Sequence, residues 1–202
     1  MLKGWSSPAL TKTYDTERVP GAEFTMQQAF TRLVNRVFHG KGYDCKPELP
    51  DLVCELGYRY TKGALYVSDG DAGAASHHET EDPHDPLVQA GSKLPHLWSQ
   101  SGNSKEVSTL DLLKQNMVLI TAEDDSPWLD AAKGQKLPID AHALTSSSKT
   151  FRADDANVRA VLKLEAGEAL LVRPDAQIAW RAERKESGHQ DELRSVLEKI
   201  FG

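Results

Sequence analysis

The sequence predicts an α/β protein in which a mixed sheet with helices on both faces follows an N-terminal helical arm. Three observations lead to this fold class: an amphipathic helix near the start, an acidic stretch, and a regular alternation of strand and helix patterns after it. We therefore expect an arm with an extended segment over residues 1–62, an acidic connector over 63–92, and an α/β domain over 93–202.

Residues 22–39 form the strongest predicted helix. Apolar side chains recur along one face with the 3.6-residue period, which predicts packing against a core. Pro20 and Gly21 are expected to keep upstream residues out of this helix, and Gly40 to end it. The apolar stripe consists of Met26, Ala29, Phe30, Leu33, Val34, Val37 and Phe38. The later run Leu52 to Tyr60 mixes β-formers with Gly57 and predicts a strand or an extended arm.

Residues 63–92 contain no Lys or Arg, which predicts a solvated connector. Imidazoles and carboxylates that would suit zinc, iron or copper gather here, at His77, His78, Glu79 and His84. Because no helix or strand is predicted to hold them, we expect no specific metal site. A glycine pair, Gly70 and Gly73, lacks the spacing of a phosphate-binding loop.

The C-terminal part begins with a β-α-β unit. Met117 to Ala122 is a continuous apolar run, as expected for a strand covered on both faces. The helix from Ser126 to Lys133 has an N-cap serine followed by proline, with glycine as its stop. Pro138 to Leu144 returns as a second strand, and the crossover should be right-handed.

A helix from about Ala156 to Glu165, ended by Gly167, leads into a hairpin and then a last helix over 190–201. The hairpin strands are Ala169 to Val172 and Ile178 to Trp180, joined by a turn that contains a proline and an aspartate. The order β-α-β-α-β-β-α is the thioredoxin-like plan.

Cysteine usage excludes the chemistry of thioredoxin itself. That chemistry requires a low-pKa thiol at the start of the helix after the first central strand, and Asp124 to Trp128 occupy this position without a cysteine. Cys45 and Cys54 lie outside the domain at a spacing typical of neither a redox pair nor a zinc knuckle, so we expect two reduced thiols.

A formal charge of -6 and a pI near 5.6 argue against nucleic acid as a partner. The sequence has neither an apolar run of about 18 residues that could span a bilayer nor an apolar signal core in its first residues. We therefore expect a cytoplasmic protein without membrane contacts.

Candidate chemistry is sparse. His96 could act as an acid or base near neutral pH, with Trp98, Trp128, Tyr58 and Tyr60 as apolar walls for a substrate, whereas the competing interpretation is a structural histidine. The sequence shows neither a Ser-His-Asp arrangement with a nucleophile elbow nor a paired-carboxylate motif.

Several segments occur in an order that resembles one enzyme family. They are Leu2 to Leu10 with Tyr14 to Pro20, then Glu55 to Tyr60 and Gly91 to His96, and finally the hairpin Ala169 to Arg181. Together they are similar to the FAD-dependent aromatic hydroxylases of the phenol hydroxylase and polyketide hydroxylase group. Ala176 stands where that family usually has glycine, which predicts a strained left-handed residue or a different turn.

The resemblance implies a C-terminal part of such a hydroxylase, with a thioredoxin-like domain that lacks cysteines. The family's FAD-binding motifs are absent from the chain, so we expect no cofactor. Three functions in natural-product metabolism then compete. The chain could be a cofactor-free cyclase or isomerase acting on a hydrophobic or phenolic intermediate, a binding module that pairs with itself or with a partner hydroxylase, or a truncated remnant.

Overall fold

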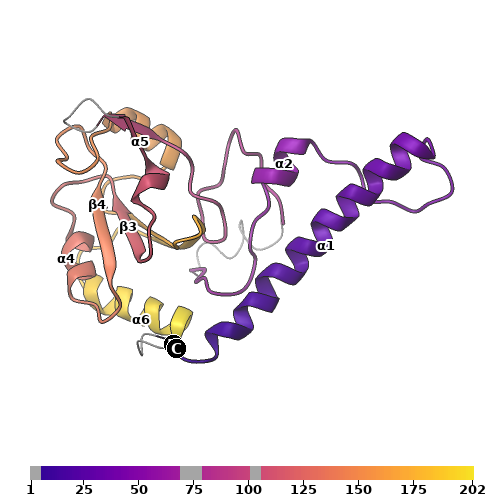
Figure 1. Ribbon diagram of the computed structural model, residues 1–202. Coiled ribbons are helices and arrows are strands. Elements are labelled where there is room, and N and C mark those ends of the chain that lie inside the picture. Colours follow the sequence, from indigo (N-terminus) through magenta and orange to yellow (C-terminus); the bar gives the residue numbers. More distant parts are fainter. Residues whose placement is uncertain (1–5, 69–78, 101–105) are drawn as a thin grey trace.

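The computed structural model describes residues 6–68, 79–100 and 106–202. Figure 1 shows an α/β domain from which one long helix and its returning loop project to one side. This arm contains α1 (Leu10–Val37) and α2 (Asp51–Leu56). The remaining elements, in chain order, are β1 (Trp98–Gln100), β2 (Glu106–Ser108), the 3-10 helix η1 (Thr109–Leu112), β3 (Met117–Thr121), α4 (Pro127–Lys133), β4 (Ile139–Ala143), α5 (Asp155–Leu162), β5 (Ala169–Val172), β6 (Ile178–Ala182) and α6 (His189–Phe201).

The main sheet has the strand order β4-β3-β5-β6. Strand β3 is parallel to β4 and antiparallel to β5, and β5 pairs with β6 as an antiparallel hairpin. The helices α4, α5 and α6 follow β3, β4 and β6, so the predicted thioredoxin-like order is confirmed. A two-stranded antiparallel sheet of β1 and β2 precedes the main sheet and was not predicted.

Alternation along β3 divides the hydrophobic core into two layers. Met117 and Leu119 belong to a cluster with the apolar faces of α4 and α6. Val118 and Ile120 belong to a second cluster, which contains the apolar side chains of α5. Because successive side chains of a strand point to opposite faces, this division places helices on both faces of the sheet, as predicted.

Of the ends of α4 and α5, that of α4 lies where the sequence predicted it and that of α5 does not. Helix α4 begins with Pro127 at its first position and ends at Gly134, as predicted. Helix α5, however, ends earlier than expected, because Lys163 adopts the left-handed conformation with φ 47°. The predicted end at Gly167 is therefore wrong. Leu162 and Leu164 on either side of Lys163 are both fully buried, so the early reversal places two leucines in the core.

The predicted start of the long helix is also wrong, since α1 runs through Pro20 and Gly21 from Leu10. Pro20 removes only one backbone hydrogen bond and is exposed. Gly21 faces the ring of Tyr58, and a Cβ at this position would lie 3.2 Å from Tyr58 Cε1. The missing side chain at Gly21 thus lets the ring of Tyr58 pack close to the helix backbone.

The prediction that the apolar stripe of α1 packs into a core is wrong as well. Met26, Leu33 and Val37 are 67%, 50% and 57% exposed. The buried side of the helix is instead largely polar and consists of Glu17, Phe24, Gln28, Thr31 and Val34. An identical 3.6-residue period arises whether a stripe faces the core or faces outward, and in this helix every member of the stripe except Val34 is exposed.

The run Leu52 to Tyr60 is mainly helical, which corrects the predicted strand or extended arm. Pro50 precedes the first turn, Asp51 supplies a carboxylate near the positive helix end, and Gly57 follows the last residue. After Gly57 the chain is extended, with one isolated bridge between Tyr58 and Thr80. No helix within the described ranges has the length and apolarity to cross a membrane.

The predicted acidic connector is only partly solvated. Ala64, Val88 and Ala90 are buried, and the amide of Gly91 donates to the carbonyl oxygen of Ile178 at 2.8 Å. Both described ends of the segment therefore pack on the hairpin of the domain.

Candidate functional site

A buried ion pair joins the arm to the domain. Arg173, directly after β5, donates from Nη1 and Nη2 to the two carboxylate oxygens of Glu17 in α1, at 2.7 and 2.9 Å. The side chains are 14% and 5% exposed. Asp175 accepts from the same guanidinium at 2.7 Å, and Glu17 also accepts from the amide of Ala64 at 2.6 Å. We call Glu17, Arg173 and Asp175 the junction.

The junction keeps its guanidinium charged. Burial opposes the charge of Arg173, but the hydrogen bonds that Arg173 donates to Glu17 and the charges of Asp175 and Glu17 outweigh it and raise the pKa of Arg173 above its ordinary value. The guanidinium carbon lies 5.7 Å from the ring centroid of Tyr60. The cation therefore contacts an aromatic face as well as two carboxylates.

A second buried cation, Arg59, holds the C-terminal end of the connector. Arg59 is 1% exposed and donates from Nε to Ser92 Oγ at 3.1 Å and from Nη2 to the carbonyl oxygen of Ala90 at 3.2 Å. Glu81 lies 3.5 Å from Arg59 Nε. Burial lowers the pKa of Arg59, and the charge of Glu81 offsets part of this effect.

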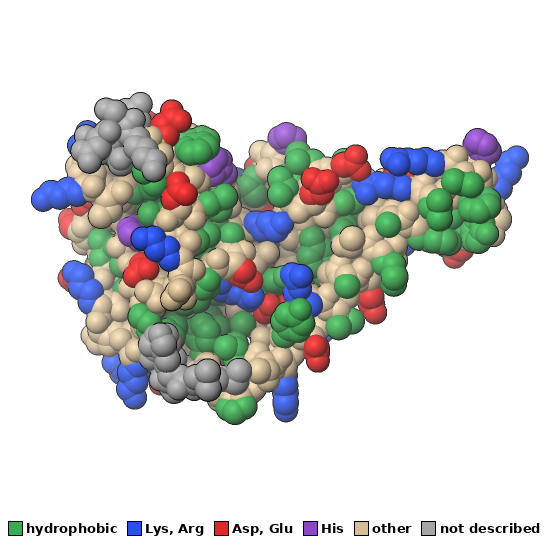
Figure 2. All heavy atoms as spheres, in the orientation of Figure 1, with side chains coloured by type: hydrophobic (Ala, Val, Ile, Leu, Met, Phe, Trp, Pro, Cys, Tyr) green, Lys and Arg blue, Asp and Glu red, His purple; other side chains and the backbone are tan. Residues whose placement is uncertain are grey.

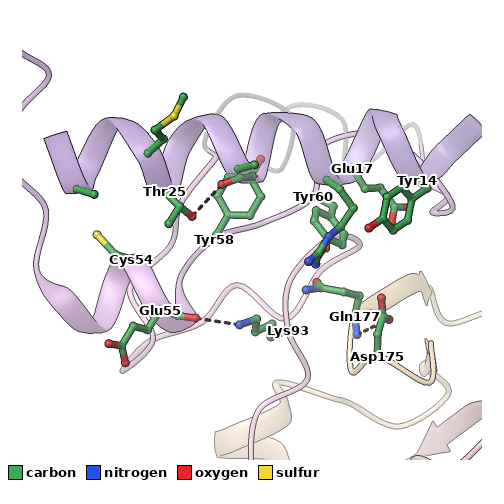
Figure 3. Close-up of a pocket in the computed structure, with 15 residues that line it drawn as sticks. Tyr14, Glu17, Thr25, Cys54, Glu55, Tyr58, Tyr60, Lys93, Asp175 and Gln177 are labelled. Carbon is green, nitrogen blue, oxygen red and sulfur yellow. Dashed lines mark hydrogen bonds between the residues drawn. The ribbon is translucent and has the colours of Figure 1, made fainter.

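Glu17 and Asp175 of the junction line a groove of about 800 Å³ between α1 and the hairpin turn. Figure 3 shows Tyr58 and Tyr60 below the helix, with Lys93 and Gln177 opposite. The rings of Tyr58 and Tyr60 meet edge to face with centroids 6.1 Å apart. The groove is lined by Tyr14, Glu17, Arg18, Gly21, Ala22, Thr25, Met26, Ala29, Cys54, Glu55, Tyr58, Tyr60, Lys93, Asp175 and Gln177.

The structure brings only some of the predicted site residues together. Tyr58 and Tyr60 line the groove, whereas His96 lines a neighbouring cavity of about 660 Å³. Trp98 is exposed and stacks edge to face on His96 with ring centroids 4.6 Å apart. Trp128 is 0% exposed and donates from Nε1 to the carbonyl oxygen of Gly167 at 2.9 Å. It thus forms part of the domain core, and the role of His96 as acid or base stays a prediction.

Sequence reasoning missed the junction. Glu17 and Arg173 are 156 positions apart, so no periodicity connects them. A signal was nevertheless present, because each lies within a segment that carries the family resemblance. The segments Tyr14 to Pro20 and Ala169 to Arg181 meet at the junction. The segments Glu55 to Tyr60 and Gly91 to His96 meet where the carbonyl oxygen of Gly91 accepts from the amide of Tyr60 at 3.0 Å.

Metal ligands do not gather within the part of the chain that the structure describes, where no group of three or more His, Cys, Asp or Glu side chains could hold an ion. His77 and His78 lie outside the described residues.

The family of the chain follows from its C-terminal domain. A family model described as "Aromatic-ring hydroxylase, C-terminal" matches residues 88–202. The chain belongs to this family. The match covers the sheet, its helices and the hairpin whose Arg173 forms the junction. The predicted resemblance is therefore confirmed.

Curated aromatic-ring hydroxylases and monooxygenases are similar to the chain over almost its whole length. A 4-methyl-5-nitrocatechol 5-monooxygenase of Burkholderia sp is 34% identical over 98% of this chain and 37% of its own length. A tetracenomycin A2 monooxygenase-dioxygenase of Streptomyces glaucescens is 32% identical over 100% of this chain and 35% of its own length. The chain thus spans little more than a third of these relatives.

Solved structures of aromatic-ring hydroxylases show the same fold. Aklavinone-11 hydroxylase, in a ternary complex with FAD and aklavinone, superimposes with a TM-score of 0.86 at 24% identity, over 99% of this chain and 36% of that one. The flavin-dependent monooxygenase PieE, in complex with FAD and substrate, gives a TM-score of 0.75 at 25% identity, over 99% of this chain and 41% of that one. Both the arm and the domain are therefore shared.

Proposed function

We propose that the chain acts as the C-terminal part of an aromatic-ring hydroxylase, and that α1 is the surface on which the FAD-containing part docks. The observation that carries this proposal is the outward apolar stripe of α1. Its exposed members Met26, Leu33 and Val37 lie one or two turns apart on the side of α1 opposite Glu17 and Thr31. The exposed Val19 extends this surface two turns toward the start of the helix.

The stripe is continuous with an aromatic cluster at the outer end of the arm. Figure 2 shows hydrophobic side chains gathered there. Tyr43 meets Phe30 and Phe38 with ring centroids 5.7 and 5.1 Å apart, and all three are exposed. Contiguous exposed apolar surface of this kind is typical of an interaction site.

The length of the relatives favours one occupant for this surface. About two thirds of each curated relative lies outside its match to this chain. The structures of aklavinone-11 hydroxylase and PieE, which share the fold, are both complexes with FAD. We therefore assign the stripe to the FAD-containing part, whether that part belongs to the same polypeptide or to a separate one.

Co-expression tests this assignment. The tagged chain is expressed with the part of the Streptomyces glaucescens relative outside the match, and bound flavin is measured per purified chain by absorbance. The wild-type chain should retain flavin, whereas Met26→Gln combined with Leu33→Gln should lose most of it, because two polar groups enter an apolar contact. Gln27→Ala, on an exposed position beside the stripe, is the matched control.

Retention of flavin by the double variant at the level of the control would contradict the proposal. A wild-type chain that carries no flavin and instead forms a dimer lost in the double variant would assign the stripe to a second copy. The cofactor-free cyclase or isomerase gains no support from the geometry, since His96 faces a different cavity from Tyr58 and Tyr60. That activity stays a prediction from the sequence.

A further inference from the structure

Strand β4 is an edge of the main sheet, and its outer side carries unpaired backbone groups. The strand order gives β4 a neighbour, β3, on one side only. The amide of Leu144, directly after β4, donates to the carbonyl oxygen of Thr121 in β3 at 2.9 Å. Because the direction of these groups alternates along a strand, the amides and carbonyls of Ile139, Ala141 and Ala143 point away from β3. None of the described residues forms a hydrogen bond with this outer row.

The opposite edge of the sheet, by contrast, is covered. In β6 the carbonyl oxygens of Ala179 and Ile178 accept from the amides of Tyr66 and Gly91, each at 2.8 Å. Strand β4 also lacks the features that commonly protect an edge, since it contains no proline, no lysine and no bulge. The outer row of β4 is therefore available to a further strand.

The free row is confined to β4 itself. Beyond the strand, the amide of Ala153 donates to the carbonyl oxygen of Thr145 at 3.0 Å, so the following loop occupies the edge there. A further strand thus has residues 139–143 to pair with. An antiparallel strand centred on Ala141 would use the whole of this row.

The side chains of β4 match a second copy of the same strand. Asp140 and His142 lie on one face of the sheet, on either side of Ala141. In a two-fold antiparallel pair centred on Ala141, each Asp140 lies opposite the His142 of the second copy. Moving the centre by one residue places Asp140 opposite Asp140, or His142 opposite His142. Because like groups directly opposite each other are unfavourable, one register is preferred.

Both side chains have hydrogen-bonding capacity for this contact. Asp140 accepts only from Asn116 Nδ2, at 3.2 and 3.3 Å, in the described structure. Nδ1 of His142 has no hydrogen-bond partner among the described residues. A neutral imidazole carries one N–H group, which can donate to a carboxylate, so the contact does not require a charged histidine.

We propose that β4 pairs with β4 of a second copy of this chain across a two-fold axis, which joins the two main sheets into one continuous sheet. The pair is centred on Ala141, with reciprocal hydrogen bonds between the outer rows and with Asp140 of each copy opposite His142 of the other. Figure 1 shows β4 on the side of the domain away from α1. The contact is therefore separate from the surface proposed for the FAD-containing part.

Sedimentation equilibrium of the full chain tests the association. We expect a monomer–dimer equilibrium between about 1 and 200 μM chain. Asp140→Lys should weaken the dimer at least about tenfold, because a lysine then lies opposite each histidine. Asp191→Lys makes the same change of charge at an exposed position of α6 and should leave the dissociation constant unchanged.

Ala141→Pro tests the backbone contact separately. Since the amide of Ala141 points away from β3, proline removes no hydrogen bond within the sheet but removes two across the two-fold axis. The dimer should again weaken at least about tenfold. Thermal unfolding shows whether each variant retains its fold, and Asp140→Lys carries the test if Ala141→Pro unfolds.

Cross-linking determines the register. In a background with serine at Cys45 and Cys54, Ala141→Cys places two thiols on directly opposite residues, whose Cα atoms should lie about 5.5 Å apart, within reach of a disulfide. Mild oxidation should convert this variant into a covalent dimer. Ala160→Cys, at an exposed position of α5, should stay monomeric under the same conditions.

A monomer at every concentration, an unchanged dissociation constant in folded Asp140→Lys, or no cross-link through residue 141 would each overturn the proposal. The dimer should persist when Met26→Gln is combined with Leu33→Gln, and its loss in that variant would assign the association to α1 instead. Flavin retention is a separate measurement on a different surface, so failure of one proposal is distinguishable from failure of the other.

Discussion

At the scale of single residues, the junction is the contact whose loss should matter most. Replacing Arg173 with Gln leaves the buried carboxylate of Glu17 without its cation, and breaking a buried pair in this way costs about 3 kcal/mol or more. Urea denaturation should show this loss. Arg194→Gln removes an exposed ion pair with Asp191 and should cost less than about 1 kcal/mol. Equal losses in the two variants would show that the junction contributes no more than a surface pair.

His142 on β4 makes the stability of the folded protein depend on pH. Burial lowers the pKa of His142, opposed by the charge of Asp140 and reinforced by that of Lys114, and its Nδ1 is buried without a hydrogen-bond partner in the described structure. The folded state therefore binds a proton less readily than the unfolded state, whose histidine has its ordinary pKa near 6.5. The stabilisation from the neutral imidazole is complete above that pH and is lost as the pH falls through the lowered pKa.

Urea unfolding at about pH 7.5 and about pH 5 measures this effect. The wild-type protein should lose more of its free energy of unfolding on acidification than His142→Gln, which cannot take up the proton. Identical losses in both proteins would mean that His142 titrates alike in the folded and unfolded states.

At the scale of elements, the β5–β6 hairpin contains local strain. Ala176 has φ 67°, a left-handed conformation that costs an alanine about 1–2 kcal/mol. Ala176→Gly relieves the strain but gains about 0.4–1 kcal/mol of unfolded-chain entropy, so we expect a net stabilisation of about 0.5 kcal/mol. Ala160→Gly, at an exposed position in α5, should instead destabilise by about 1 kcal/mol. Thermal unfolding compares the two, and destabilisation by both would contradict the strain.

Elements held by local patterns could be predicted from the sequence, and those held by distant partners could not. Strand β3 is apolar throughout because it is covered on both faces, and Pro127 and Gly134 bound α4 by their own backbone preferences. The arm obeys different constraints. Helix α1 passes through Pro20, and its polar side is buried because partners from residues 46–64 satisfy it.

At the scale of the whole molecule, the candidate site could be predicted only in part. Tyr58 and Tyr60 line the groove because the extended chain after α2 returns beneath α1, and their role as walls for a substrate stays a prediction. The ion pair between Glu17 and Arg173 depends on how the two ends of the chain meet, which no local pattern records. Both residues nonetheless lie in segments that carry the family resemblance.

The polar contacts beneath the outer half of α1 give the arm a fixed axial register. Gln28 exchanges two hydrogen bonds with the returning loop, donating to the carbonyl oxygen of Pro47 at 3.2 Å and accepting from the amide of Leu49 at 2.9 Å. Thr31 donates to the carbonyl oxygen of Lys46, also at 3.2 Å. Apolar surfaces slide past one another with little change in energy, whereas these directional bonds are satisfied at one alignment. The helix is therefore held at two places along its length, by the junction at Glu17 and by the returning loop at Gln28 and Thr31.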